Sequence, residues 1–390
     1  MMIIKQCIKN YLPFILKIYK FYKRRMKIKN YFKTKYSKNV LLSYITYPFK
    51  KGEYFRHTNY FEAMSHAKIL NELGYNVDVI DYDYQGKIDF SKYDLLVGFG
   101  EVFHKYFEYG KSKIKTIYYG TGMHVCHQNH ATLKRLKDVY SKKSIWLGKS
   151  TRYVEKAWTH QTYLVDAMIV LGNEVCVESY RKFYDGEIFN IPAPFYKVID
   201  AWKLIQSNNV GRSFIWFGSS GLIHKGLDLV LDFFSKNPDL KLHICGPVKN
   251  EPDFEQVYWK ELYETPNIIT HGFVDIKTEK FKEILNDCSF TIFPSCSEGG
   301  CPSVITLIGN AGIIPIITKE TTISTGYEIW IENFTIEAIE RAVNKALLLS
   351  DREILELRKK NLAYVLKNHT AEVYYKRLKE AYLSILGNYK

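Results

Sequence analysis

An acid followed by two glycines marks the segment whose residues are best suited to chemistry. Glu298, Gly299 and Gly300 come after residues 289–293, a short β-branched and aromatic run that predicts a strand. Pro302 then suits the first turn of a helix, because its missing N–H would have no partner there. Glycines let backbone N–H groups approach a ligand, and a helix start favours a phosphate, whereas a carboxylate accepts hydrogen bonds from sugar hydroxyls. The segment therefore favours a site for a phosphorylated sugar; the alternative is an ordinary strand-to-helix turn with a solvated acid.

A second glycine loop carries a cation. Residues 213–217 predict a strand, and the loop after them contains Gly218, Ser219, Lys225 and Gly226. We expect a helix to begin near Gly226, with Lys225 able to reach a diphosphate as a point charge. The alternative is a plain loop with an exposed lysine.

The first of these segments resembles the donor-binding motif of the retaining GT-B glycosyltransferases of family four. In that family a Glu before a glycine pair holds the donor sugar, and a second Glu eight positions further on binds the ribose. Glu298, Gly299 and Gly300 match the first part of the motif. Thr306 stands where the second Glu is expected and offers one short hydroxyl without charge, so ribose binding departs from the family pattern.

The second segment resembles the family's other donor loop, which has an Arg after its first Gly and a Lys before a later Gly. Gly218 stands at the first Gly, and Lys225 with Gly226 matches the later pair. Ser219 replaces the Arg, so one of the two expected cations is missing. A later stretch resembles the family's segment around the nucleobase, where Gly272 is the matching position.

The elements that must position these loops alternate between strands and helices. Strands are predicted at 39–47, 76–81, 94–99 and 114–119, with a helix at 58–73 between the first two, and a further strand is predicted at 164–171. This opening predicts a Rossmann-like domain whose parallel sheet binds ligands at its carboxyl edge.

Histidines follow the fourth predicted strand at that edge. His124 lies just past the strand end and resembles the family position that faces the donor sugar and the acceptor, with His127 as its competitor. On the same acceptor side, Gly52 resembles one glycine of the pair usual in the family's first loop. The alternatives for the histidine cluster are a zinc site, in which His124, His127 and His130 act with Cys126, and a plain surface turn.

The resemblance implies an α/β GT-B fold, in which two Rossmann-like doubly wound domains face each other across a cleft. We expect a basic amphipathic segment at 1–38, an N-terminal acceptor domain at 39–205 and a C-terminal nucleotide-sugar donor domain at 206–369. A final helix at 370–390 is expected to pack back on the N-terminal domain. Residues 200–210 predict a linker between the domains.

The formal charge of +14 is concentrated at the N-terminus. Residues 1–52 hold 14 Lys and Arg and no acid, which leaves 55 − 14 = 41 basic residues against 41 acidic ones in the rest of the chain. Apolar and basic residues alternate over 1–38, which predicts an amphipathic helix, interrupted at Pro13, on an anionic membrane surface. The alternatives are a disordered basic tail and nucleic-acid binding. We expect no nucleic-acid partner, because the body is neutral and carries no matching motif.

The seven cysteines form no CxxC pair and no disulfide framework, which predicts that the protein resides in a reducing cytosol. No apolar run approaches the roughly 20 residues of a transmembrane helix, and no small-residue cleavage site marks a signal peptide. The expected location is therefore the cytoplasm, at the inner face of the cell membrane. A length of 390 residues with 46% hydrophobic residues is enough for two domains, each with its own core.

The activity that the resemblance implies is transfer of a sugar, with retention, from a nucleoside-diphosphate sugar to a saccharide or lipid-linked acceptor in cell-surface polysaccharide synthesis. Glu298 would position the sugar and His124 would contact the sugar or acceptor. Lys225 and the helix start near Gly300 would stabilise charge on the leaving diphosphate, so no metal or other cofactor is expected. The alternatives are a non-catalytic GT-B scaffold or nucleotide-sugar-binding protein at the membrane, favoured by the two departures from the motifs, and an inverting transferase.

Overall fold

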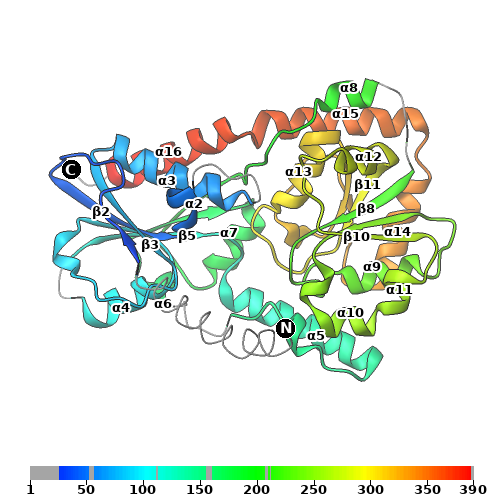
Figure 1. Cartoon of the computed structure of the whole chain (residues 1–390), viewed down its shortest axis with the longest axis horizontal. Coiled ribbons are helices and arrows are strands. Elements are labelled where there is room, and N and C mark those ends of the chain that lie inside the picture. Colours follow the sequence, from blue (N-terminus) through cyan, green and yellow to red (C-terminus); the bar gives the residue numbers. More distant parts are fainter. Residues whose placement is uncertain are drawn as a thin grey trace, which may run out of the picture. The chain divides into compact units, whose positions relative to one another are not determined.

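Figure 1 shows the computed structural model of the chain, which describes residues 26–51, 57–110, 113–154, 160–206, 210 and 212–387. The chain divides into two compact units, residues 1–119 with 157–168, and residues 120–156 with 169–390. The described parts combine parallel strands with helices that follow them along the chain, which confirms the predicted α/β class.

A first sheet holds the strands of the first half of the chain. In spatial order its described strands are β1 (Lys27–Ile28), β3 (Tyr75–Asp81), β2 (Lys38–Tyr44), β4 (Leu95–Gly98), β5 (Lys115–Gly120), β6 (Ala167–Leu171) and β7 (Glu187–Ile191). β2 runs parallel to β3 and β4, and β4 runs parallel to β5. β1 is an antiparallel strand at the edge beside β3. The four strands predicted at the start of the chain are confirmed as β2, β3, β4 and β5.

Helices cover both faces of β2, β3 and β4. α3 (Asn59–Glu72) packs on β2 and β3 beside α2 (Tyr47–Lys51), and α4 (Glu101–Tyr109) packs beside α6 (His160–Leu164). Figure 1 shows these two pairs on opposite faces of the strands. Two further helices, α5 (Val125–Lys143) and α7 (Glu174–Arg181), belong to the second unit, where α7 packs on β7.

A second sheet lies entirely within the second unit. Its described strands follow the order β10 (Ile268–Gly272), β9 (Leu242–Cys245), β8 (Ser213–Phe217), β11 (Cys288–Phe293), β12 (Ile314–Ile317) and β13 (Ile329–Trp330). All neighbours in this order are parallel. Every residue of β9, β11 and β12 is buried, as expected for a parallel sheet that is covered on both faces.

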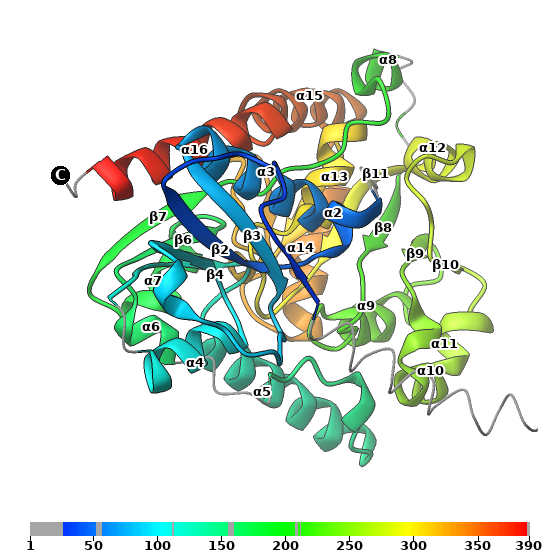
Figure 2. The same ribbon diagram turned by 60° about the vertical axis from the view of Figure 1, so that its left-hand side comes forward.

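The helices of the second sheet form two layers, which Figures 1 and 2 show from different sides. One layer contains α8 (Ala201–Gln206), α12 (Glu279–Asp287), α13 (Pro302–Ala311) and α15 (Asp351–Asn368). The other contains α9 (Leu227–Phe234), α10 (Pro252–Val257), α11 (Trp259–Tyr263) and α14 (Ile336–Leu347). After α15, the last helix α16 (Ala371–Gly387) packs on β7.

The described part of the predicted amphipathic segment is not a helix. β1 pairs its backbone with β3, and Lys27 Nζ lies 2.8 Å from Asp78 Oδ2. The helix prediction is wrong for residues 26–38, because pairing with the sheet edge satisfies backbone groups that a helix would have satisfied internally. Residues 1–25, the rest of this segment, lie outside the described residues.

Two predicted boundaries are also wrong. The predicted linker at 200–210 contains α8, because Ala201 and Ile205 lie one turn apart and bury their side chains against Leu362 of α15. The strand predicted from residue 164 begins at Ala167 instead, since the preceding residues form α6. Both errors concern helices of six residues or fewer, in which apolar spacing is too brief to be read from sequence.

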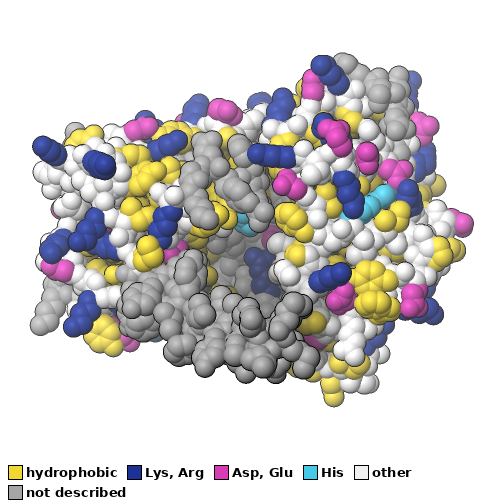
Figure 3. Space-filling model, in the orientation of Figure 1, with side chains coloured by type: hydrophobic (Ala, Val, Ile, Leu, Met, Phe, Trp, Pro, Cys, Tyr) yellow, Lys and Arg dark blue, Asp and Glu magenta, His cyan; other side chains and the backbone are white. Residues whose placement is uncertain are grey.

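The surface of the described chain mixes charges of both signs. Figure 3 shows basic and acidic side chains interspersed on the face that it presents, apart from the atoms drawn in grey. Within the described ranges, no helix has both the length and the apolar character needed to cross a bilayer.

Candidate functional site

A reversal of strand order in the second sheet brings the two predicted donor loops together. From β8 the chain proceeds outward through β9 to β10, and it then returns to β11 on the other side of β8. Since β8 and β11 are parallel neighbours, their carboxyl ends meet at one edge of the sheet. Such a reversal is where ligands bind in doubly wound folds. The loop after β8 carries Lys225, and the loop after β11 carries Glu298.

Lys225 and Glu298 form a buried ion pair in these loops. Lys225 Nζ lies 2.5 Å from Glu298 Oε1, and the two side chains are only 5% and 7% exposed. The hydroxyl of Ser295 donates a hydrogen bond of 2.9 Å to the same carboxylate oxygen. Both partners therefore hold the carboxylate in one orientation, which a group that positions a sugar requires.

Arg152 supplies a second cation that the sequence motifs did not indicate. Its Nη1 lies 3.7 Å from Glu298 Oε2, and its side chain is 43% exposed. The preceding turn is held by Asp253, whose carboxylate accepts the Lys149 N–H at 2.7 Å and the Ser150 hydroxyl at 2.6 Å. Tertiary packing alone brings this loop to Glu298, so no local sequence pattern could have revealed Arg152.

The charges of this group favour an anionic ligand. Burial raises the pKa of the Glu298 carboxyl, but the charges of Lys225 and Arg152 outweigh burial and lower that pKa to about 2. Glu298 is therefore ionised at neutral pH, and the three side chains carry a formal charge of +1. The two cations suit a diphosphate, while the carboxylate suits sugar hydroxyls.

His224 joins the two loops from behind. Its ring is fully buried, and its Nε2–H donates to the Ser297 carbonyl at 2.5 Å. With that proton on Nε2, Nδ1 accepts a hydrogen bond of 2.8 Å from the Thr132 hydroxyl of α5. Burial, and then the charge of nearby Arg152, lower the pKa of His224 to about 3. His224 is therefore a neutral positioning residue between Lys225 and the β11 loop, a role that its place in the sequence does not show.

Glycines allow these loops to touch other backbone segments. Gly226 has a φ of +70°, and a Cβ atom there would lie 2.3 Å from the carbonyl oxygen of Pro294. A Cβ atom on Gly299 would lie 2.3 Å from the carbonyl oxygen of Thr121. Both positions therefore exclude a side chain because of protein backbone, whereas the sequence suggested room for a ligand.

The backbone amide of Gly300, beside the helix start that was expected to stabilise the diphosphate, already has a partner in the protein. Its N–H donates a hydrogen bond of 2.6 Å to the Thr322 hydroxyl, so it is not available to a phosphate. α13 then begins at Pro302, which fits the predicted first turn but contributes no N–H. The Thr322 hydroxyl, from the loop after β12, thus accepts the N–H of Gly300 at the helix start that was expected to stabilise the diphosphate.

The other predicted donor residues do not bond to the ion pair, although a Cβ atom on Gly218 would lie 3.3 Å from the Lys225 Cδ atom. Gly218 follows β8, and Ser219 lies exposed beside it with no charge to offer. Gly272 ends β10, which β9 separates from β8. The hydroxyl of Thr306 donates 2.7 Å to the Pro302 carbonyl within α13, so only its oxygen lone pairs remain for a ribose. The roles of these four residues stay predictions.

The structure contradicts the predicted contact of His124 with the sugar or acceptor. His124 is the N-cap of α5, where its Nδ1 accepts the Cys126 N–H at 3.2 Å. Its side chain is 0% exposed, and its ring stacks on Phe183 at 4.1 Å. Burial, and then the charge of His127, lower the pKa of His124 to about 4. The position just past a strand end was identified correctly, but packing against Tyr180 and Phe183 encloses the side chain.

The remaining acceptor-side predictions receive little support. His127 is partly buried, and its Nε2 has no hydrogen-bond partner among the described residues. Nowhere in the described ranges do three or more His, Cys, Asp or Glu side chains form a group that could hold a metal, so the zinc alternative for His124, His127, His130 and Cys126 lacks a ligand set. Gly52 lies outside the described residues.

A family model matches most of the second half of the chain. Residues 199–365 match the model of the family described as Glycosyl transferases group 1. This range includes the whole second sheet and both partners of the Lys225–Glu298 ion pair. A search of curated protein sequences found no match.

Solved structures share the fold at low sequence identity. Trehalose 6-phosphate synthase from Burkholderia multivorans has a TM-score of 0.59 at 10% identity, over 91% of this chain and 98% of that one. Anabaena HepE, solved with UDP and glucose, has a TM-score of 0.54 at 11% identity, over 89% and 100%. S. aureus TarM, in complex with fondaparinux, alpha-GlcNAc-glycerol and UDP, has a TM-score of 0.50 at 17% identity, and the match covers 73% of this chain but 54% of TarM. The chain thus has an α/β GT-B fold, and the family match together with this fold supports a glycosyltransferase.

Proposed function

We propose that this chain is a retaining glycosyltransferase, which moves a sugar from a nucleoside-diphosphate sugar to a saccharide or lipid-linked acceptor in cell-surface polysaccharide synthesis. The observation that carries the proposal is the buried Lys225–Glu298 pair with Arg152 beside it, at the reversal of strand order in the second sheet. UDP bound to TarM and to HepE supports a nucleotide-sugar donor.

Each charged residue has a role in this proposal. Glu298 accepts hydrogen bonds from the donor sugar and orients it, since its low pKa keeps it ionised. Lys225 and Arg152 stabilise the negative charge that develops on the leaving diphosphate. Arg152 thereby provides the cation that Ser219 does not. Because fixed cations carry this charge, the proposal needs no metal ion or other cofactor.

The test of the proposal is a calorimetric panel of UDP-, GDP-, ADP- and CMP-sugars. We expect one donor to bind saturably. Glu298→Ala and Lys225→Ala should each weaken its affinity at least tenfold, because each variant loses a charged hydrogen bond. Lys236→Ala, an exposed lysine beyond α9, is the control that should leave affinity unchanged. Product NMR then decides between retention and inversion at the anomeric carbon. No binding by any donor to the folded protein would reject the enzyme proposal.

One observation favours a second candidate, a nucleotide-sugar-binding scaffold without turnover. The Gly300 amide and the Thr306 hydroxyl, both expected to serve the donor, bond to the protein itself. A donor that binds in calorimetry but is neither transferred to any acceptor nor hydrolysed would select this candidate.

We further propose peripheral attachment to an anionic membrane through the basic N-terminal segment. Twelve Ile, Leu, Phe and Tyr side chains stand there among seven Lys and Arg residues in the first 25 positions, and each basic group near an anionic surface adds about 1 kcal/mol. Deleting residues 1–25 keeps β1 in the sheet and should abolish co-sedimentation with phosphatidylglycerol vesicles. Equal sedimentation of the shortened and full chains would reject the attachment.

A further inference from the structure

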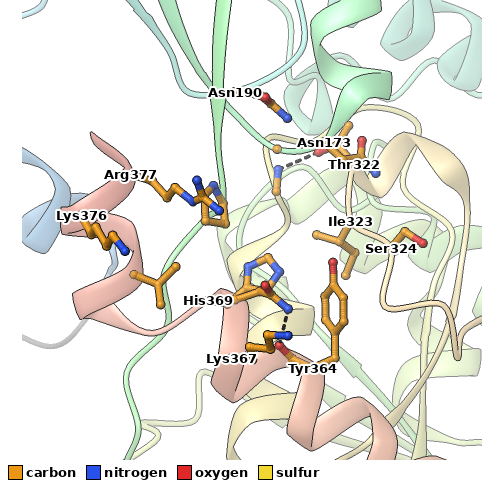
Figure 4. Close-up of a pocket in the computed structure, with 15 residues that line it drawn as sticks. Asn173, Asn190, Thr322, Ile323, Ser324, Tyr364, Lys367, His369, Lys376 and Arg377 are labelled. Atoms are coloured by element: carbon orange, nitrogen blue, oxygen red, sulfur yellow. Dashed lines mark hydrogen bonds between the residues drawn. The ribbon is translucent and has the colours of Figure 1, made fainter. Parts of the chain in front are cut away.

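We propose that a basic cavity beside the donor loops binds a phosphorylated saccharide, at a position separate from the Lys225–Glu298 pair. The cavity has a volume of about 610 Å³, within the usual range for small-molecule sites. Figure 4 shows its walls, which come from the segments after β6, β7 and β12 and from the junction of α15 with α16. All of these residues belong to the second unit.

The charge of the cavity suits a phosphate. Three cations line it, Lys367 from α15 and Lys376 and Arg377 from α16, and its lining contains no Asp or Glu. Glu380, outside the lining, lies 3.3 Å from Arg377 and 3.9 Å from Lys376, in exposed pairs that contribute little. Lys367 has no ion-pair partner among the described residues. Even counting Glu380, the local formal charge is +2, which a phosphate dianion would balance.

Neutral polar groups in the same cavity suit sugar hydroxyls. His369 is 8% exposed, and its Nδ1–H donates 2.9 Å to the Ala193 carbonyl. Burial lowers the pKa of His369, so its Nε2 stays an unprotonated acceptor. The side-chain oxygen of Asn173 caps α7 by accepting the Val175 N–H, which leaves its amide group as a donor. Asn190 adds a second amide, whose side chain has no hydrogen-bond partner within the described part of the chain.

An aromatic wall completes the cavity. Tyr364 lines it beside Ile323, and Figure 4 shows the tyrosine ring standing upright between Lys367 and Ser324. A sugar ring presents C–H groups to such a surface while its hydroxyls face the amides. The cavity therefore offers cations to a phosphate, amides and an imidazole to hydroxyls, and an apolar wall to a sugar ring. This combination suits a sugar phosphate better than an inorganic ion.

The cavity is distinct from the donor residues already described. Gly300 is the one member of the predicted donor set in its lining, and its N–H is bonded to Thr322. The Thr322 hydroxyl in turn lies 3.3 Å from the Glu298 carbonyl oxygen, so this contact forms a wall rather than an opening. Lys225 and Arg152, the diphosphate cations of the proposed function, do not line the cavity.

The test is calorimetry of the full chain with glucose 1-phosphate, glucose 6-phosphate, glucose and inorganic phosphate as separate probes. At least one sugar phosphate should bind saturably and more tightly than glucose or phosphate alone. The double variant Lys367→Gln/Arg377→Gln should weaken it at least tenfold, since two charge-assisted contacts are lost. Arg352→Gln/Lys359→Gln removes the same charge from an exposed face of α15 and should leave the affinity unchanged.

Other outcomes overturn the inference in different ways. The site is rejected if neither sugar phosphate binds at millimolar concentration. It is also rejected if the cavity variant (Lys367→Gln/Arg377→Gln) and the control variant (Arg352→Gln/Lys359→Gln) bind the sugar phosphate with equal affinity. Phosphate binding as tightly as its sugar ester rejects the saccharide part. A loss of affinity in Lys225→Met, with the cavity variant unaffected, would place the sugar phosphate in the donor site. Donor binding is measured separately, so failure here leaves the proposed function standing.

Discussion

Replacing Lys225 with Met is expected to lower turnover by a factor of about 10²–10³, the effect of removing one fixed donor to a developing charge. Lys225 is 5% exposed and lies 2.5 Å from Glu298, so no water can replace it. Charge grows on the diphosphate as the sugar leaves, and a cation here acts more strongly on the transition state than on the bound donor. We therefore expect kcat to fall more than KM rises, measured with the donor that the binding panel identifies.

Arg152→Met provides the matched comparison for this prediction. Arg152 is 43% exposed and 3.7 Å from the carboxylate, so solvent screens it and a loss of about tenfold or less is expected. Lys236→Met is the control for an exposed lysine outside the site. Equal turnover in Lys225→Met and the unmodified protein would remove Lys225 from the mechanism. A larger effect for Arg152 than for Lys225 would make the arginine the principal diphosphate cation.

The pH dependence of this pair has a definite sign. Because the pKa of Glu298 is lowered to about 2 in the folded protein, its ionised form stabilises the fold above the ordinary pKa of a glutamate. That contribution declines as the pH falls from the ordinary value through about 2. Protonation of Glu298 therefore should not limit activity between pH 5 and 9, and any inflection in that range belongs to another group.

The sequence was sufficient to predict the two glycine-containing loops after β8 and β11, because local and global patterns agree there. β8 and β11 are short apolar runs, each followed by a loop with glycines, and Pro302 and Gly312 delimit α13 as their chemistry requires. Because β8 and β11 are parallel neighbours, the loops that follow them lie at the same edge of the sheet. The proximity of Lys225 and Glu298 depends only on this strand order, so it could be predicted from the sequence.

The missed residues depend on packing between segments that are distant in the chain. Arg152 reaches Glu298 only because Asp253 holds its loop, a contact that spans about a hundred residues. His124 was misassigned because the sequence cannot show that Phe183 covers its ring. The Gly300 amide looked free because Thr322, its partner, belongs to the loop after the next strand. For His124 and Gly300 a motif gave the residue type correctly and tertiary structure decided its availability, whereas no motif indicated Arg152.

Removing the guanidinium of Arg135 is expected to destabilise the fold by about 3–5 kcal/mol, the cost of leaving a buried charge without its partner. Arg135 of α5 lies 2.6 Å from Asp228 of α9, and their side chains are 1% and 2% exposed. Asp138 lies 3.0 Å from the same arginine and is 40% exposed, but it is itself acidic and cannot replace the positive charge beside Asp228. In Arg135→Met we expect Tm to fall by roughly 6 °C or more.

A double variant separates the ion pair from simple packing. Asp228→Leu in the Arg135→Met background removes the stranded carboxylate and should recover much of the lost stability, since an apolar pair of similar volume is often as stable as a buried ion pair. Arg377→Met, in an exposed pair with Glu380, is the control and should change Tm little. If the double variant is as unstable as the sum of the single variants, the arginine acts through its packing alone. If it recovers, the pair chiefly fixes which face of α5 meets α9. Because Asp228 comes three residues after Lys225, the pair then also fixes where the loop that carries Lys225 ends.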